Sequence, residues 1–267
     1  MMKKICLVTG SRAEFFILEN LIKRIYKDKQ ISLHLLVTGS HNSRFFGNTI
    51  NQIKKRKVKI GGIIDIMIEG DREIDIAKSF SIGVEKFTKK LLKIKPDVLL
   101  ILGDRYEIYA VAIAACFCKI PIAHIYGGES TEGVIDEAIR HSITKLSHIH
   151  FVQTKKYLKR VKQLGENKLN IFNVGSLGVE AIKKTNFLKK KELEKKLNIK
   201  FRKKNIIITF HSETLKSKRE NLKNLNILLK SLNKLKDTSL FFTMPGADIN
   251  FRSIVKSIRS FLKKKQT

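Results

Sequence analysis

The sequence predicts an α/β fold built from parallel sheets. Short apolar runs rich in β-branched residues alternate with longer stretches in which apolar residues recur every three or four positions. The connections are short, and Pro96 and Pro121 each stand just before an apolar run, where a strand tolerates proline. Regular alternation of strand and helix with short connections is typical of a doubly wound parallel sheet.

The first part of the chain carries seven expected strands and five expected helices. The strands lie at residues 4–9, 32–38, 62–68, 97–102, 122–125, 149–153 and 170–174. The helices lie at 14–27, 76–93, 107–118, 136–146 and 155–164. Together these elements complete one Rossmann-like domain, for which we predict the bounds 1–178.

A linker is expected at 179–204, with a helix at 177–184 and a strongly charged stretch behind it. A second alternation then begins, with strands at 205–210 and 239–244 and helices at 216–235 and 248–262. A separate domain usually needs upwards of about 100 residues. We therefore expect residues 205–267 to form part of a second Rossmann-like domain.

The composition permits a sizeable core and excludes several classes of protein. Hydrophobic residues make up 43% of the 267 residues, which is ordinary for a globular protein. No apolar run reaches the ~18 residues of a membrane span. Cys6, Cys116 and Cys118 stand among apolar residues, which predicts core thiols in a reducing cytoplasm. The last two point to different sides of a helix, so we expect no metal site there.

The charge is strongly basic and unevenly spread. The formal net charge is +30, and residues 151–267 carry 30 basic and 8 acidic residues. Such a charge raises the hypothesis of nucleic-acid binding. The excess is mostly lysine, however, and no helix-turn-helix, zinc-finger or aromatic RNA-binding motif accompanies it. We expect no specific nucleic-acid partner.

The turn after the first expected strand is similar to a phosphate-binding turn. Gly10 permits a tight bend, and the following helix presents N–H groups to an anion. The pattern is not GxGxxG, so no dinucleotide cofactor is indicated. Arg12 could hold a diphosphate with two hydrogen bonds. In the alternative interpretation, Ser11 caps the helix and Arg12 pairs with Glu14 on the surface.

Charged residues follow two further strands. Asp104 ends one strand with Arg105 beside it, and Glu129 follows two glycines that let a backbone approach a ligand closely. Asp136 and Arg140 share one face of the next helix. In an open α/β sheet, ligands bind at the edge formed by the carboxyl ends of the strands. The alternative is that Asp104 and Asp136 only cap helices.

Two histidines also follow strands. His41 stands beside the first turn. It could contact a ligand, or it could be a solvated loop residue without a binding role. His211 follows a strand of the second part, from which it would face the carboxylates of the first across a cleft.

The motifs with the most specific pattern are TGSRAE, VTGSH, FGNT, LGDRYE, PIAHIYGGESTEGVIDEAIRHSITKLSH and FNVGSLG, at 9–14, 37–41, 46–49, 102–107, 121–148 and 172–178. They resemble the hydrolysing UDP-N-acetylglucosamine 2-epimerases of sialic and legionaminic acid biosynthesis, over nearly the whole chain. This resemblance implies a glycosyltransferase-B-like fold, with two Rossmann-like domains and the sugar nucleotide between them.

The resemblance also implies roles for individual residues. The acid–base carboxylates would be Asp104, Glu129 and Asp136, with His211 contributing from the second part. Substrate binding would fall to Arg12, His41, Arg105 and Arg140. The family reaction eliminates UDP across C1 and C2 of the sugar and then adds water, so arginines would stabilise the departing diphosphate.

We therefore expect a cytoplasmic homo-oligomeric enzyme that acts on UDP-N-acetylglucosamine or a 2,4-diacetamido relative, without cofactor or metal. Two alternatives stay open. One is a non-hydrolysing 2-epimerase, against which the segment IDEAIRHSITKLSH argues. The other is a shortened, inactive protein that only associates with a partner. The family continues with a glycine- and serine-rich turn that grips the uridine diphosphate, and this chain stops before it.

Overall fold

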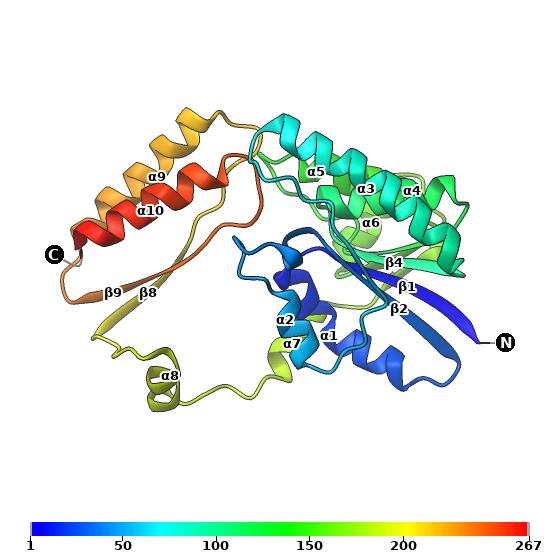
Figure 1. Cartoon of the computed structure of the whole chain (residues 1–267), viewed down its shortest axis with the longest axis horizontal. Helices are drawn as coiled ribbons and strands as arrows, with labels where there is room; N and C mark the ends of the chain where they lie inside the picture. Colours follow the sequence, from blue (N-terminus) through cyan, green and yellow to red (C-terminus); the bar gives the residue numbers. More distant parts are fainter. Residues whose placement is uncertain (1, 266–267) are drawn as a thin grey trace. The chain divides into compact units, whose positions relative to one another are not determined.

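The computed structural model describes residues 2–265, and the chain divides into two compact units between Lys183 and Lys184 (Figure 1). Helices and parallel strands alternate in both units, so the predicted α/β fold class is confirmed. The domain bounds expected at residues 178 and 204 stay predictions.

One sheet of seven parallel strands forms the first unit, in the order β3-β2-β1-β4-β5-β6-β7. The strands are β1 (Lys3–Thr9), β2 (Ile31–Thr38), β3 (Gly62–Ile64), β4 (Val98–Leu102), β5 (Ile122–Ile125), β6 (Ile149–Val152) and β7 (Ile171–Asn173). Only β3 is much shorter than expected. It pairs with the last three residues of β2, and the apolar run beyond it enters the core from a loop, where Ile66 is buried.

The helices of the first unit are α1 (Arg12–Lys27), α2 (Ile50–Lys55), α3 (Glu73–Ile94), α4 (Tyr106–Phe117), α5 (Asp136–Leu146), α6 (Lys155–Gln163) and α7 (Leu177–Lys183). The first unit also contains two 3₁₀ segments, η1 (Gly39–Asn42) and η2 (Lys168–Asn170). The sequence did not predict α2, because this helix is short and only Ile50 and Ile53 in it are buried.

Helices cover both faces of the seven-stranded sheet. Alternate residues of a strand enter different cores: Leu99 packs with α3, α4 and α5, whereas Leu100 packs with α1 and α2. Because both faces are apolar and covered, polar side chains of the sheet gather at the ends of its strands.

The cysteines follow the expectation only in part. Cys6 is buried in β1, but Cys116 is exposed and Cys118 is half-buried. The expectation of a core thiol at Cys116 is wrong, because the last turn of α4 turns this side chain and the neighbouring Phe117 away from the buried cluster.

The second unit contains two parallel strands and three helices among its described residues. They are β8 (Lys204–Thr209), β9 (Thr238–Thr243), α8 (Lys190–Leu197), α9 (Lys218–Asn233) and α10 (Phe251–Lys265). Apolar residues of α9 and α10 pack together in a small core that includes Leu225 and Ile254. The helix α8 was not predicted, because none of its residues is buried and its sequence is mostly charged.

No helix within residues 2–265 is both long enough and apolar enough to cross a membrane.

The loop after β5 is locked against α6 through Gly128. This residue has a φ of +80°, and a Cβ placed on it would lie 2.6 Å from the carbonyl oxygen of Tyr157. Arg160 of α6 donates a hydrogen bond of 2.6 Å to the carbonyl oxygen of Gly128. The loop that carries Glu129 is therefore fixed in place by backbone contacts that only glycine permits.

We predict that Gly128→Ala destabilises the first unit by about 2–4 kcal/mol, because it adds a clash to the strain of a positive φ. Thermal unfolding followed by circular dichroism measures the effect. Gly47→Ala is the matched control: Gly47 has a φ of +84° but no atom within 4 Å of an added Cβ. It carries the strain without the clash, so equal losses in the two variants would contradict the proposed packing.

Candidate active site

The predicted polar residues of the first unit lie at the carboxyl edge of the sheet, in the segments 10–14, 39–42, 103–107 and 126–140 that follow β1, β2, β4 and β5. The N-cap positions of α4 and α5 are occupied by Arg105 and Ile135, and neither caps through its side chain. Neither Asp104 nor Asp136 therefore occupies the N-cap position itself. Asp136 is instead the partly buried first residue of α5.

A nearly buried arginine joins two loops of this edge. Arg140 forms an ion pair with Asp104, although the two residues are on different elements and 36 positions apart in sequence. The same guanidinium binds Glu137 at 2.7 Å and donates to the hydroxyl of Thr131 at 3.1 Å. Charge-assisted hydrogen bonds of this kind fix the direction of a carboxylate.

Glu137 is a member of this cluster that the sequence interpretation missed. Its carboxylate accepts hydrogen bonds from the hydroxyl of Ser130 (2.9 Å) and from the backbone N–H of Thr131 (2.7 Å), and it lies 3.1 Å from the ring of His141. Burial alone would raise its pKa, but these donors lower it. The signal in the sequence was the helical spacing of Glu137 to Arg140 and His141.

The environment of Glu129 differs from that of Asp104. Its carboxylate is half-buried and accepts a hydrogen bond from the side-chain amide of Gln153, which directly follows β6. Burial raises the pKa of Glu129, while Gln153 and Arg140 act in the opposite direction. The edge thus holds one carboxylate paired with an arginine and one that takes up a proton more readily than an ordinary glutamate.

A buried histidine supports the backbone beside Asp104. His124 of β5 donates from Nε2 to the carbonyl oxygen of Gly103 at 2.9 Å, and its Nδ1 lies 3.3 Å from the hydroxyl of Thr144. Burial lowers the pKa of His124 to about 4, so the ring is neutral at physiological pH. It holds the turn in place without adding charge.

His41 is also neutral and buried. Its two ring nitrogens lie 3.1 Å from the hydroxyl of Thr9 and 2.9 Å from that of Thr49. Burial lowers the pKa of His41 to about 4. In this structure His41 joins the turns after β1 and β2, so a solvated loop residue is the wrong description, and its contact with a nucleotide stays a prediction.

The turn after β1 has Ser11 as the N-cap of α1, as one interpretation predicted. Glu14 accepts hydrogen bonds from Gly10 and Ser11. Arg12 is the exposed first residue of α1, and its role toward a diphosphate stays a prediction.

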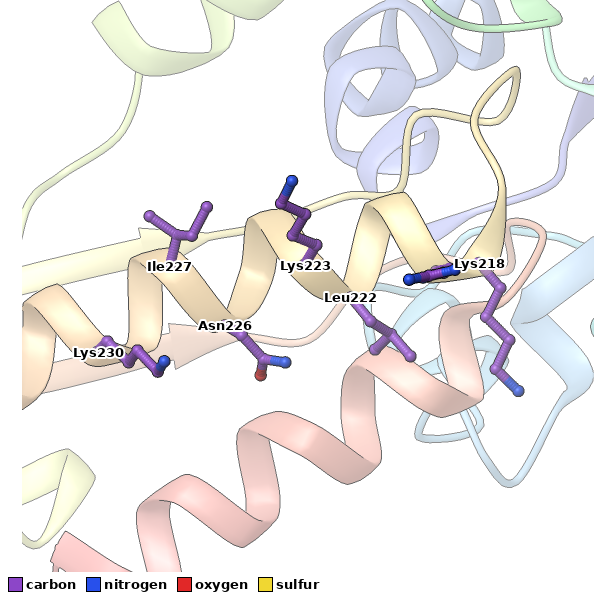
Figure 2. Close-up of a pocket in the computed structure, with 7 residues that line it drawn as sticks. Lys218, Leu222, Lys223, Asn226, Ile227 and Lys230 are labelled. Atoms are coloured by element: carbon purple, nitrogen blue, oxygen red, sulfur yellow. The ribbon is translucent and has the colours of Figure 1, made fainter.

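The second unit carries His211, whose Nδ1 lies 3.6 Å from a carboxylate oxygen of Asp248. The ring is about half exposed, and its catalytic role stays a prediction. A surface hollow of this unit runs along α9 and is lined by Lys218, Arg219, Leu222, Lys223, Asn226, Ile227 and Lys230 (Figure 2). These residues form a basic face of the helix, and none of them is among the predicted site residues.

Within residues 2–265, no three His, Cys, Asp or Glu side chains gather in a way that could hold a metal ion.

Carboxylates and arginines at the carboxyl edge of a covered parallel sheet define the class of α/β enzymes that act on anionic small molecules. The particular family follows from comparison with known proteins. The chain belongs to the UDP-N-acetylglucosamine 2-epimerase family, whose model matches residues 23–266.

Among its relatives is the GDP/UDP-N,N'-diacetylbacillosamine 2-epimerase (hydrolyzing) of Campylobacter jejuni. It is 44% identical over 262 residues, which are 98% of this chain and 68% of the relative. The UDP-N,N'-diacetylbacillosamine 2-epimerase (hydrolyzing) of Legionella pneumophila is 40% identical over 182 residues, 68% of this chain and 48% of that protein.

Solved structures show the same fold. The UDP-GlcNAc 2-epimerase of Neisseria meningitidis bound to UDP-GlcNAc has a TM-score of 0.74 at 23% identity, covering 96% of this chain and 70% of that one. The Methanocaldococcus jannaschii enzyme in complex with UDP-GlcNAc and UDP also has a TM-score of 0.74, at 20% identity, covering 98% of this chain and 70% of that one. The predicted glycosyltransferase-B-like fold is confirmed at the level of these neighbours.

We predict that Arg140→Met destabilises the first unit by about 1–3 kcal/mol near neutral pH, because Asp104 and Glu137 lose a shared cation. Against the effect of burial, hydrogen bonds from Thr131, Ser130 and His141 lower the pKa of Glu137 in the folded chain. Because a protonated Glu137 no longer forms an ion pair with Arg140, the difference in stability between the two proteins should shrink in acid. Urea denaturation of the two proteins at several pH values measures it.

The control variant is Arg24→Met, which removes an exposed arginine 3.5 Å from Glu180 and should change stability little. A loss in Arg140→Met that is equally large in acid would contradict the assignment to these carboxylates.

Proposed function

We propose that the chain is a hydrolysing sugar-nucleotide 2-epimerase, which converts UDP-N-acetylglucosamine or a 2,4-diacetamido relative into the mannosamine-configured sugar and UDP. The observation that carries the proposal is the pair of unlike carboxylates at the carboxyl edge: Asp104 is bound by Arg140, and Glu129 has a raised pKa. Family membership supplies the substrate class.

The reaction needs both kinds of carboxylate. When the bond between C1 and the diphosphate breaks, positive charge develops at C1, and a fixed anion such as Asp104 stabilises it. The proton leaves C2, and a later proton must return to C2 from the other face while water supplies the hydroxyl at C1. Glu129 is suited to move one of these protons, because burial brings its pKa closer to the working pH. Asp136 and, from the second unit, His211 are the proposed further acid–base groups.

Arginines would bind the diphosphate of the substrate. Arg12 is exposed at the start of α1, and Arg105 follows β4, so both can meet an anion at the edge. Arg140 holds two carboxylates in the structure, which supports a role in orienting Asp104 beside its proposed role in binding substrate.

The hydrolysing branch is supported by the names of the more similar relatives. Two proteins named as hydrolysing are 44% and 40% identical to the chain, whereas the Neisseria relative named UDP-N-acetylglucosamine 2-epimerase is 33% identical. A homo-oligomeric assembly and a cytoplasmic location belong to the same proposal.

The test is incubation of the purified chain with UDP-N-acetylglucosamine and with UDP-N,N'-diacetylbacillosamine. Coupled detection should find free UDP, and proton NMR should find the free sugar with inverted C2. An epimerised sugar that still carries UDP would assign the non-hydrolysing reaction instead. Absence of both turnover and binding would favour the alternative of an association module.

We predict that Glu129→Gln lowers kcat about 10²–10⁴-fold, because the amide cannot transfer a proton. The nearly isosteric change should leave the unfolding temperature close to that of the unchanged chain. Glu132→Gln serves as the control, since Glu132 is exposed in the same loop and should retain full activity. Normal turnover by Glu129→Gln would remove this residue from the mechanism.

A further inference from the structure

Three turns of the carboxyl edge meet around one buried carboxylate that neither the sequence interpretation nor the proposed mechanism uses. Glu107, the second residue of α4, is only 1% exposed. A Cβ placed on Gly10 would lie 2.5 Å from its Cγ, and a Cβ on Gly39 would lie 3.0 Å from its Oε1. The glycines after β1 and β2 therefore make room for this side chain.

A second buried carboxylate closes the turn after β1. Glu14 of α1 accepts a hydrogen bond of 2.7 Å from the backbone N–H of Gly10 and one of 3.2 Å from the hydroxyl of Ser11. The N–H of Gly10 is thus occupied by the chain's own carboxylate.

The two carboxylates differ in their hydrogen bonds. Arg105 donates from Nε to Oε1 of Glu107 at 2.8 Å, whereas Oε2 of Glu107 has no hydrogen-bond partner among residues 2–265. Burial and the neighbouring Glu107 together raise the pKa of Glu14 to about 7, against the effects of Gly10, Arg105 and Ser11. The titratable groups on the elements that meet here are Arg12, Glu14, His41, Asp104, Arg105 and Glu107.

The raised pKa of Glu14, about 7, lies near neutral pH. Asp104 is paired with Arg140, and His41 is neutral with a pKa of about 4. At the turn after β1, the charge that faces an anion therefore changes with the proton on Glu14.

We propose that Glu14 and Glu107 are positioning residues, and that Glu14 holds a proton in the folded chain and so keeps the Gly10 turn and Arg105 ready to receive the phosphates of the substrate. This inference rests on the proposed function for the identity of the ligand. The proton itself is a property of the folded chain and can be measured without any ligand.

Loss of the proton has two consequences. A second negative charge then faces Glu107 in a buried place, which destabilises the turn. The same charge opposes an incoming diphosphate, so binding weakens as the pH rises.

The first experiment follows thermal unfolding from about pH 6 to about pH 8. A carboxyl whose folded pKa is raised to about 7 from a reference value of 4.5 contributes stability that is lost as the pH rises through the folded value. The unfolding temperature of the unchanged chain should fall by about 2–4 °C more over this range than that of Glu14→Gln, in which the side chain stays neutral.

Glu19→Gln is the matched control on the same helix. Glu19 is also buried, but hydrogen bonds from Lys23 and Arg56 lower its pKa despite its burial. This variant should keep the pH dependence of the unchanged chain. Parallel curves for the unchanged chain and Glu14→Gln would overturn the proposal.

The second experiment measures KM for the UDP-sugar over the same range. KM of the unchanged chain should rise about 3–10-fold from pH 6 to pH 8, and KM of Glu14→Gln should stay flat. Glu107→Gln should raise KM more than it lowers kcat, because Arg105 loses the group that orients it. A KM that is independent of pH in the unchanged chain would overturn the positioning role.

The two proposals fail in distinguishable ways. If no UDP-sugar is turned over, the proposed function fails, while the unfolding experiment still decides whether the proton is held. Calorimetric titration with inorganic diphosphate then replaces KM: binding that weakens with pH in the unchanged chain but not in Glu14→Gln supports the inference, and equal behaviour contradicts it.

Discussion

Covering both faces of the seven-stranded sheet is the constraint on which the rest of the first unit depends. Most strand residues that point to either side are therefore apolar, as Leu99 and Leu100 are on β4. Most polar groups then lie where the strands end, and parallel pairing brings all carboxyl ends to one edge. The concentration of carboxylates and arginines at that edge follows from packing, and the proposed active site lies there because these side chains are accessible to a ligand.

At this edge, the surroundings of each carboxylate decide its role. Asp104 and Glu137 share one guanidinium, Glu129 has an amide beside it, and Glu14 lies in a buried turn with another carboxylate. Neutral histidines hold the backbone between them without altering the charge. One edge can therefore keep some acid groups negative and leave others able to carry protons, although all are aspartate or glutamate.

The sequence predicted much of this and failed for identifiable physical reasons. Strand positions followed from apolar runs, since a parallel strand covered on both faces is mostly apolar. The pairing of Asp104 with Arg140 could not be predicted, because it joins the loop after β4 to helix α5, and only the pairing of β4 with β5 brings the two together. Glu107 was passed over because an acid in the first turn of a helix usually faces solvent. The helix α8 was missed because nothing in it is buried, so its sequence lacks an apolar stripe.

The lysine-rich face of α9 and the net charge of +30 have a consequence for how a substrate reaches the chain. A nucleotide sugar carries negative phosphates, and a positive field steers such a solute toward the protein during diffusion. The Debye length is about 8 Å at physiological ionic strength, so most of this long-range attraction is screened there. In dilute buffer, where screening is weaker, the same field also attracts other polyanions. Association rates will therefore depend on the supporting electrolyte, and phosphate ions will compete with the nucleotide for the same attraction.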